Sequence, residues 1–127
     1  MAEGKTGLER FKQERARLQE QFQRFAGTNS KRFLALDNRV YEAGALSAKT
    51  KELLGLVASL VLRCDDCISY HLDRCRSEGV TTAELEEAIA IGLIVGGSIT
   101  IPHIRRAVDA WLESGGGESV SGVDPIE

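Results

Sequence analysis

The sequence predicts an all-α, single-domain bundle of about six helices. Apolar residues recur at intervals of three and four through most of the 127 residues, and no stretch alternates strictly for more than a few residues. Hydrophobic residues make up 43% of the chain and charged residues 28%, which is the balance of a folded globular domain. A chain of this length buries about two thirds of its unfolded surface, which is enough for one core.

Two amphipathic helices are predicted at the N-terminal end. The first carries its apolar stripe over residues 8–25 and stops near Gly27. Asn29 or Ser30 suits the N-cap of the second, because these side chains accept hydrogen bonds from the unpaired N–H groups of a first turn. We expect this second helix to end at Gly44.

The third and fourth helices are predicted to form the centre of the bundle. Ser47 is a good N-cap for a third helix over residues 48–62, which is apolar on nearly every side and is expected to be buried. The fourth helix starts around Asp65 and Asp66 and runs to Gly79, a natural residue just past a helix end.

The fifth and sixth helices have clear start signals. Thr81 and Glu84 form a capping box that opens a fifth helix reaching Gly96–Gly97. Pro102 suits the first turn of a sixth helix. From Ser114 the composition changes to Gly, Ser and acidic residues, so we expect a disordered tail over residues 114–127.

Charge and hydropathy exclude several classes of protein. The net charge is −3, although residues 1–32 carry eight Lys and Arg against four Asp and Glu. Acidic residues are interleaved there, so we interpret this region as a solvated helix face and expect no nucleic-acid partner. The longest apolar stretches are about half of a membrane span. The N-terminus has charges where a signal peptide needs apolar residues, so a cytoplasmic protein without a membrane partner is expected.

A Cys-x-x-Cys pair with a nearby histidine is the most informative motif. Cys64 and Cys67 lie at the start of the fourth helix, where the free N–H groups and the helix dipole favour a thiolate. His71 follows Cys67 by four residues and so lies on the same helical face. Glu52, in the otherwise apolar third helix, can face this cluster and act as a base.

A zinc site and purely structural roles are the alternatives to redox chemistry for the cysteines and histidines of the chain. Zinc would find suitable ligand types in the set Cys64, Cys67, His71 and Cys75, with Glu52 as a substitute. The first four lie along one helix and would not converge tetrahedrally, so we expect no metal and no other cofactor. Cys75 is interpreted as a small buried hydrophobe. His103 is either an active-site residue donated across a subunit contact or, more simply, a first-turn surface residue.

The motif also carries a family resemblance. The pattern consists of Glu52, eleven residues, Cys-x-x-Cys, three residues and His71, and it begins within the helix start over residues 46–54. This pattern resembles the alkylhydroperoxidase D-like branch of the carboxymuconolactone decarboxylase family. The resemblance covers about residues 33–113. We therefore divide the chain into an N-terminal amphipathic helix over residues 1–30, an alkylhydroperoxidase D-like core over residues 31–113, and the tail.

The resemblance implies thiol-dependent peroxide reduction in an all-α homotrimer or homohexamer. By position, Cys67 would attack the peroxide, Cys64 would resolve it, and His71 and Glu52 would form a proton relay that activates Cys67. A peroxide substrate and a dithiol reductant are the implied partners. The residue before Cys67 is often His in peroxidase members and is Asp66 here, a negative charge that disfavours the thiolate.

Two alternative functions remain at the level of sequence. The same thiols could serve a metal-binding or redox-sensing module, or His71 and Glu52 could serve a carboxymuconolactone decarboxylase-like enzyme without redox chemistry. An independent observation concerns assembly. The third and fifth helices are apolar on more than one stripe, which a monomer of this size cannot cover, so a homo-oligomer is expected.

Overall fold

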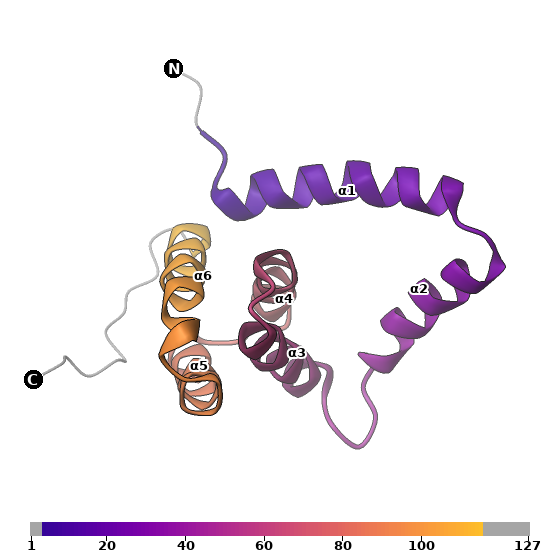
Figure 1. The fold of residues 1–127 in the computed structure, drawn as a ribbon. Helices are drawn as coiled ribbons and strands as arrows, with labels where there is room; N and C mark the ends of the chain where they lie inside the picture. The colour runs from indigo at the N-terminus through magenta and orange to yellow at the C-terminus, as the bar shows by residue number, and fades with distance from the viewer. Residues whose placement is uncertain (1–3, 116–127) are drawn as a thin grey trace, which may run out of the picture.

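A computed structural model describes residues 4–115 of the chain, and this part is all-α, as predicted (Figure 1). The six helices and one short 3₁₀ turn are α1 (Gly7–Phe25), α2 (Thr28–Val40), α3 (Ala48–Leu62), α4 (Asp65–Ser77), α5 (Thr82–Gly96), η1 (Ser98–Thr100) and α6 (Ile101–Ser114). Most of the predicted tail, from residue 116 onward, lies outside the described residues.

The core is built around α3, which packs against both α4 and α5. Helix α4 also packs against α6, and α1 crosses the bundle in contact with α6 and α4 (Figure 1). The interior joins apolar side chains from five helices and the turn before α5: Leu8, Leu56, Leu60, Ile68, Leu72, Cys75, Val80, Leu85, Ile89, Ala107 and Trp111. This packing fixes α3 and α4 against each other, and these two helices carry the candidate site.

Side-chain caps set the start of the helices that matter most here. The Ser47 hydroxyl accepts from the Thr50 N–H at 3.1 Å, which confirms the predicted start of α3. Thr81 and Glu84 form the predicted reciprocal capping box of α5. Gly79, just past the end of α4, has a φ of 80°, a left-handed conformation that glycine adopts without steric cost.

Two sequence predictions are corrected by the structure. Helix α2 begins at Thr28 with Gly27 as its N-cap and ends at Val40, so the predicted caps at Asn29 or Ser30 and the predicted end at Gly44 are wrong. The C-terminal end comes earlier because the Lys51 ammonium group donates to the carbonyl oxygens of Val40 (2.9 Å) and Glu42 (2.6 Å). The first bond satisfies a carbonyl that the end of a helix leaves without a partner, and the second holds the chain just beyond that end.

Helix α3 is buried on one face only, whereas the sequence predicts a helix that is apolar on nearly every side and buried. Glu52, Gly55, Leu56, Ser59 and Leu60 are buried, whereas other apolar residues of the same helix are exposed. The large apolar residues of α3 and α5 that are exposed are Leu54, Leu62, Ile91, Leu93, Ile94 and Val95. The described chain therefore leaves uncovered much of the apolar surface that the sequence pattern indicated.

Helix α2 lies away from the bundle of α3 to α6 (Figure 1). It has no buried residue, and its large apolar side chains Phe33, Leu36 and Val40 are exposed. No described helix is both long and apolar enough to cross a membrane.

Candidate active site

The two cysteines of the motif meet across the first turn of α4. Cys64 is the N-cap of this helix, and its Sγ accepts a hydrogen bond from the Cys67 N–H at 3.3 Å. The pair forms a disulfide, with 5.3 Å between the two Cα atoms. Cys67 is exposed and Cys64 is half-buried. In the reduced state, both sulfurs would therefore stand at the positive end of a helix, where a thiolate is stabilised.

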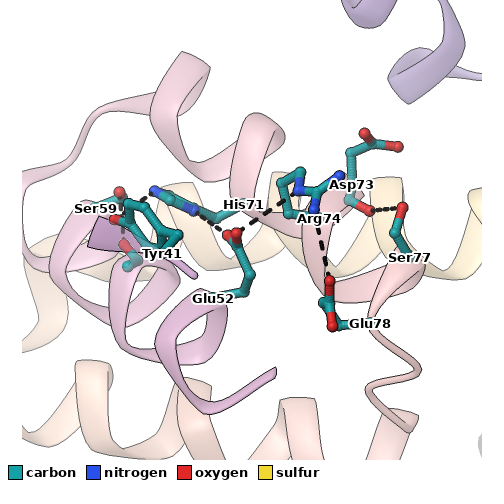
Figure 2. A network of polar contacts seen from close by, with 9 residues as sticks. Tyr41, Glu52, Ser59, His71, Asp73, Arg74, Ser77 and Glu78 are labelled. Carbon is teal, nitrogen blue, oxygen red and sulfur yellow. Dashed lines mark hydrogen bonds and ion pairs between the residues drawn. The ribbon is translucent and has the colours of Figure 1, made fainter. Parts of the chain in front are cut away.

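A buried carboxylate–imidazole pair lies between α3 and α4. Glu52 Oε1 is 2.9 Å from His71 Nδ1, and the two residues are 3% and 8% exposed (Figure 2). A carboxylate accepts hydrogen bonds only, so Nδ1 carries the proton, and Nε2 is the nitrogen that can act as a base. This pairing satisfies two polar groups whose burial would otherwise be costly.

The second oxygen of Glu52 faces an arginine. Arg74 Nε lies 3.6 Å from Glu52 Oε2, and Arg74 Nη2 lies 3.5 Å from Glu78 Oε2 (Figure 2). Arg74 comes one turn after His71 on α4, so both partners of Glu52 come from one face of that helix. Glu52 is therefore held by a contact on each oxygen.

Tyr41, the residue at the end of α2, completes the buried network. Its hydroxyl lies 3.4 Å from His71 Nε2, and the two rings are tilted with centroids 5.3 Å apart. Burial, together with the negative charge of Glu52, raises the pKa of Tyr41 above its ordinary value. The hydroxyl consequently stays protonated and can donate to the basic nitrogen of His71.

Gly55 makes this close arrangement possible. A Cβ atom at this position would lie 2.7 Å from both His71 Cε1 and the Tyr41 hydroxyl, which is closer than real side chains allow. The Ser59 hydroxyl donates to the Gly55 carbonyl at 2.7 Å. Glycine is required here because the imidazole packs directly on the α3 backbone.

An open cleft leads to the exposed cysteine. It has a volume of about 530 Å³ and runs between α1 and α4, with Cys67 and His71 both in its lining. The α1 wall combines the apolar Phe11, Leu18 and Phe22 with the polar Glu14, Arg15 and Gln19. The Arg15 guanidinium lies over the Tyr70 ring, 4.2 Å from its centroid. The lining residues include Phe11, Leu18 and Phe22 from α1, and Asp66, Cys67, Tyr70 and His71 from α4.

The remaining candidates of the sequence lie apart from this relay. Cys75 is 0% exposed, and burial, with the charges of Glu52 and Glu78, raises its pKa to about 12, which confirms a small buried hydrophobe. His103 is in the first turn of α6 and is paired with Asp65 of the same chain at 2.8 Å. Within residues 4–115, no three His, Cys, Asp or Glu side chains converge as a metal-binding cluster.

Sequence reasoning missed Tyr41 and Arg74. Arg74 follows His71 by three residues, a spacing that places both on one helical face and that could have indicated it. No such signal marks Tyr41. It lies 30 residues before His71, and the connection between α2 and α3 brings the two side chains together.

The fold and the site together define a helical protein with a Cys-x-x-Cys disulfide beside a buried Glu–His pair. Residues 29–110 match the carboxymuconolactone decarboxylase family, and the chain belongs to this family. This confirms the family resemblance carried by the motif.

Similar proteins include a crystal structure from Thermotoga maritima with 54% identity and a TM-score of 0.81, covering 83% of this chain and 92% of that one. Another structure from the same organism has 56% identity and a TM-score of 0.77, covering 83% and 89% of the two chains. It is described as a carboxymuconolactone decarboxylase family protein with a suggested involvement in antioxidative response. A family member from Legionella pneumophila, 23% identical with a TM-score of 0.77, covers 84% of this chain and 95% of its own and shares the fold.

An uncharacterized protein of the cox locus in Paracoccus denitrificans is 33% identical over 76 residues, which are 60% of this chain and 68% of that protein.

Proposed function

We propose that this protein is a thiol-dependent peroxidase that uses Cys64 and Cys67 as a redox pair. The observation that carries the proposal is the shared cleft: the exposed Cys67 lines the same cleft as His71, and the Nδ1 atom of His71 is held by the buried Glu52. A thiol within reach of an oriented base is the arrangement of an activated nucleophile. The antioxidative involvement suggested for the Thermotoga maritima relative supports the same reading.

The first step oxidises Cys67. The Cys67 thiolate attacks the terminal oxygen of a peroxide R–O–OH, the O–O bond breaks, and Cys67 becomes a sulfenic acid while the leaving RO⁻ takes a proton. Cys67 is assigned this attack because it is the exposed sulfur and the one that lines the cleft. The apolar side chains of Phe11, Leu18 and Phe22 and the cleft volume of about 530 Å³ leave room for an organic group R.

The second step resolves the sulfenic acid. The Cys64 sulfur attacks the Cys67 sulfur, the S–O bond breaks, water leaves, and the disulfide forms. The distance of 5.3 Å between the Cα atoms in the disulfide is the ordinary separation for such a bond. A dithiol reductant then exchanges with the disulfide and restores both thiols. A reducing compartment such as the cytoplasm would supply it.

Glu52 and His71 supply the proton relay in this proposal. His71 Nε2 accepts the proton of Cys67 through water in the cleft and returns it to the leaving RO⁻. Glu52 holds the tautomer and stabilises the imidazolium that forms. Tyr41 donates to the same Nε2 atom and orients the ring between transfers. Arg74 holds the other oxygen of Glu52 in place.

We also propose that the protein works as a homo-oligomer, a trimer or a hexamer. The support is the exposed apolar surface on α3 and α5, of which Ile94 at 80% exposure is the clearest case. A surface of this kind usually marks an association site.

Peroxide-dependent disulfide formation tests the proposed function. The reduced full-length protein is treated with hydrogen peroxide or an organic hydroperoxide, and its cysteines are then mapped by mass spectrometry. We expect the loss of two thiols per chain, a Cys64–Cys67 cross-linked peptide, and repeated peroxide consumption when a dithiol is supplied. If peroxide leaves the thiols reduced while a thiol-specific oxidant closes the disulfide, the peroxidase assignment is wrong.

A further inference from the structure

A second ionic cluster holds the other side of the redox motif. Asp65 is the first residue of α4, directly after Cys64. Its Oδ1 is 2.8 Å from His103 Nδ1, and its Oδ2 is 3.0 Å from Arg106 Nη2. His103 and Arg106 lie one turn apart on α6, and their side chains are 3.2 Å from each other. None of these three residues takes part in the proton relay described above.

Asp65 carries a negative charge and directly follows Cys64, whose sulfur caps α4. An uncompensated carboxylate at this position would offset the positive potential of the helix N-terminus and would therefore disfavour a thiolate there. Arg106 supplies a permanent positive charge, and His103 donates a hydrogen bond to the other oxygen. The His103 hydrogen bond, reinforced by Arg106, holds the pKa of Asp65 below its ordinary value against the opposing effect of partial burial. Asp65 is therefore ionised and compensated at the same time.

The cluster also ties the first turn of α4 to α6. Asp65 is at the start of the turn that contains both cysteines, whereas its partners come from 38 and 41 residues later in the chain. Asp66, the other carboxylate of the motif, points into the cleft, where no basic group is paired with it in the described contacts. Helix α6 thus compensates the negative charge of Asp65 but not that of Asp66, the other acidic residue between the cysteines.

We propose that Arg106 and His103 are positioning residues that tune the dithiol by neutralising Asp65. This inference rests on the proposed redox function of the pair. By lowering the negative potential at the N-terminus of α4, the two α6 residues favour the thiolates of the reduced state. The charged or titratable groups that line the cleft together with Cys67 are Glu14, Arg15, Asp37, Asp66, Tyr70 and His71, and they are unchanged in the variants below.

Charge variants give effects of opposite sign. Arg106→Gln removes the compensating charge and should raise the pKa of the reactive thiol by about half a unit, an approximately threefold loss of thiolate below that pKa. Asp65→Asn should lower the thiol pKa by a similar amount. In the Asp65→Asn background, Arg106→Gln should have little further effect, because the exposed Arg106 guanidinium is no longer held beside the motif by Asp65 and solvent screens its charge. His103→Gln should act in the same direction as Arg106→Gln.

The readouts are independent of peroxide turnover. The thiol pKa comes from the pH dependence of ultraviolet thiolate absorbance and of Cys67 alkylation in a Cys64→Ser background, to which the buried Cys75 does not contribute. The dithiol–disulfide equilibrium comes from titration of the unmodified cysteine pair in redox buffers. Arg105→Gln is the matched control, since it removes the same charge from the neighbouring exposed position of α6, outside the cluster. Thermal unfolding checks that each variant is folded.

The outcomes separate this inference from the proposed function. If Arg106→Gln and Arg105→Gln shift the thiol pKa equally, or if the Arg106 effect persists in full beside Asp65→Asn, the inference is overturned even where peroxide is consumed. Opposite shifts in the two single variants, with no further shift when Arg106→Gln is added to Asp65→Asn, support it even if the protein turns over no peroxide, because that result concerns the reactivity of the thiols alone.

Discussion

The side chains of Glu52 and His71 are joined by a 2.9 Å hydrogen bond that links α3 to α4 in the interior of the bundle. The bond fixes which nitrogen of the imidazole carries the proton, and the other nitrogen is therefore the base. The proposed chemistry depends on this pair, and the following changes test it from different sides.

Glu52→Gln should slow the oxidation of Cys67 by roughly 10²–10⁴-fold, the usual contribution of a general acid–base group. The amide oxygen still accepts from His71 Nδ1, so packing is retained, but the imidazolium loses its counter-charge. The pH profile of Cys67 alkylation should move to higher pH. Glu78→Gln is the control, because it also contacts Arg74 but does not touch His71. Superimposable profiles for Glu52→Gln and the parent protein would remove Glu52 from the site.

Cys67→Ser should abolish peroxide consumption, because it removes the sulfur exposed in the cleft. Cys64→Ser should instead allow a single oxidation event that stalls at a sulfenic acid, which a carbon nucleophile can trap. Stopped-flow peroxide consumption and mass spectrometry distinguish the two cases. Undiminished turnover by Cys67→Ser would contradict the assignment of attacking and resolving thiols.

Gly55→Ala should damage the site and not only the packing, because its Cβ would press on His71 and Tyr41. Overpacking of this kind costs about 1–3 kcal/mol in stability. Gly92→Ala is a matched control: its Cβ would lie 2.7 Å from Leu60 Cδ2, within the core and away from the relay. We expect both variants to melt earlier, but only Gly55→Ala to slow Cys67 oxidation. Equal oxidation rates would show that the close approach at Gly55 is merely structural.

Tyr41→Phe should lower the rate of Cys67 oxidation by about two- to tenfold, the value of one ordinary hydrogen bond. The hydroxyl stays protonated because burial raises the pKa of Tyr41, so its donation to His71 should persist through neutral and mildly alkaline pH. Tyr70→Phe serves as the comparison, since that ring also lies against His71 but with a T-shaped contact. A rate identical to that of the parent protein would leave Tyr41 with a packing role only.

Light scattering at micromolar concentration should give a multiple of the 13.8 kDa chain mass, most simply a trimer or a hexamer. Ile94→Glu should shift the protein toward smaller species, because it places a charge in the exposed apolar surface of α5. Ala83→Glu, at the start of the same helix, should leave the mass unchanged. A stable monomer of the parent protein would refute the proposed assembly.

Much of the fold could be predicted from local signals. The start of α3 at Ser47 and that of α5 at Thr81 depend on side chains that bond to their own first turn, so a short window of sequence contains the whole cause. The end of α2 has a distant cause, the Lys51 ammonium group on the next helix, and the sequence window around Gly44 does not contain it.

The residues of the site also fall into those with a local signal in the sequence and those that depend on distant contacts. Cys64, Cys67 and His71 lie within eight residues, where helical spacing alone places them on one side of α4. The Tyr41 contact depends on the path of the chain after α2, and the pairing of His103 with Asp65 depends on how α6 packs against α4; no periodicity encodes either.

Cys75 limits the covalent states that the chain can reach. Three cysteines allow three intramolecular pairings, yet Cys75 is fully enclosed and its thiol, with a pKa of about 12, remains protonated at neutral pH. Thiol–disulfide exchange needs an accessible thiolate, so Cys75 cannot attack the Cys64–Cys67 bond or capture a second chain. Repeated oxidation and reduction would therefore return the same single cross-link, without isomers to be repaired between cycles.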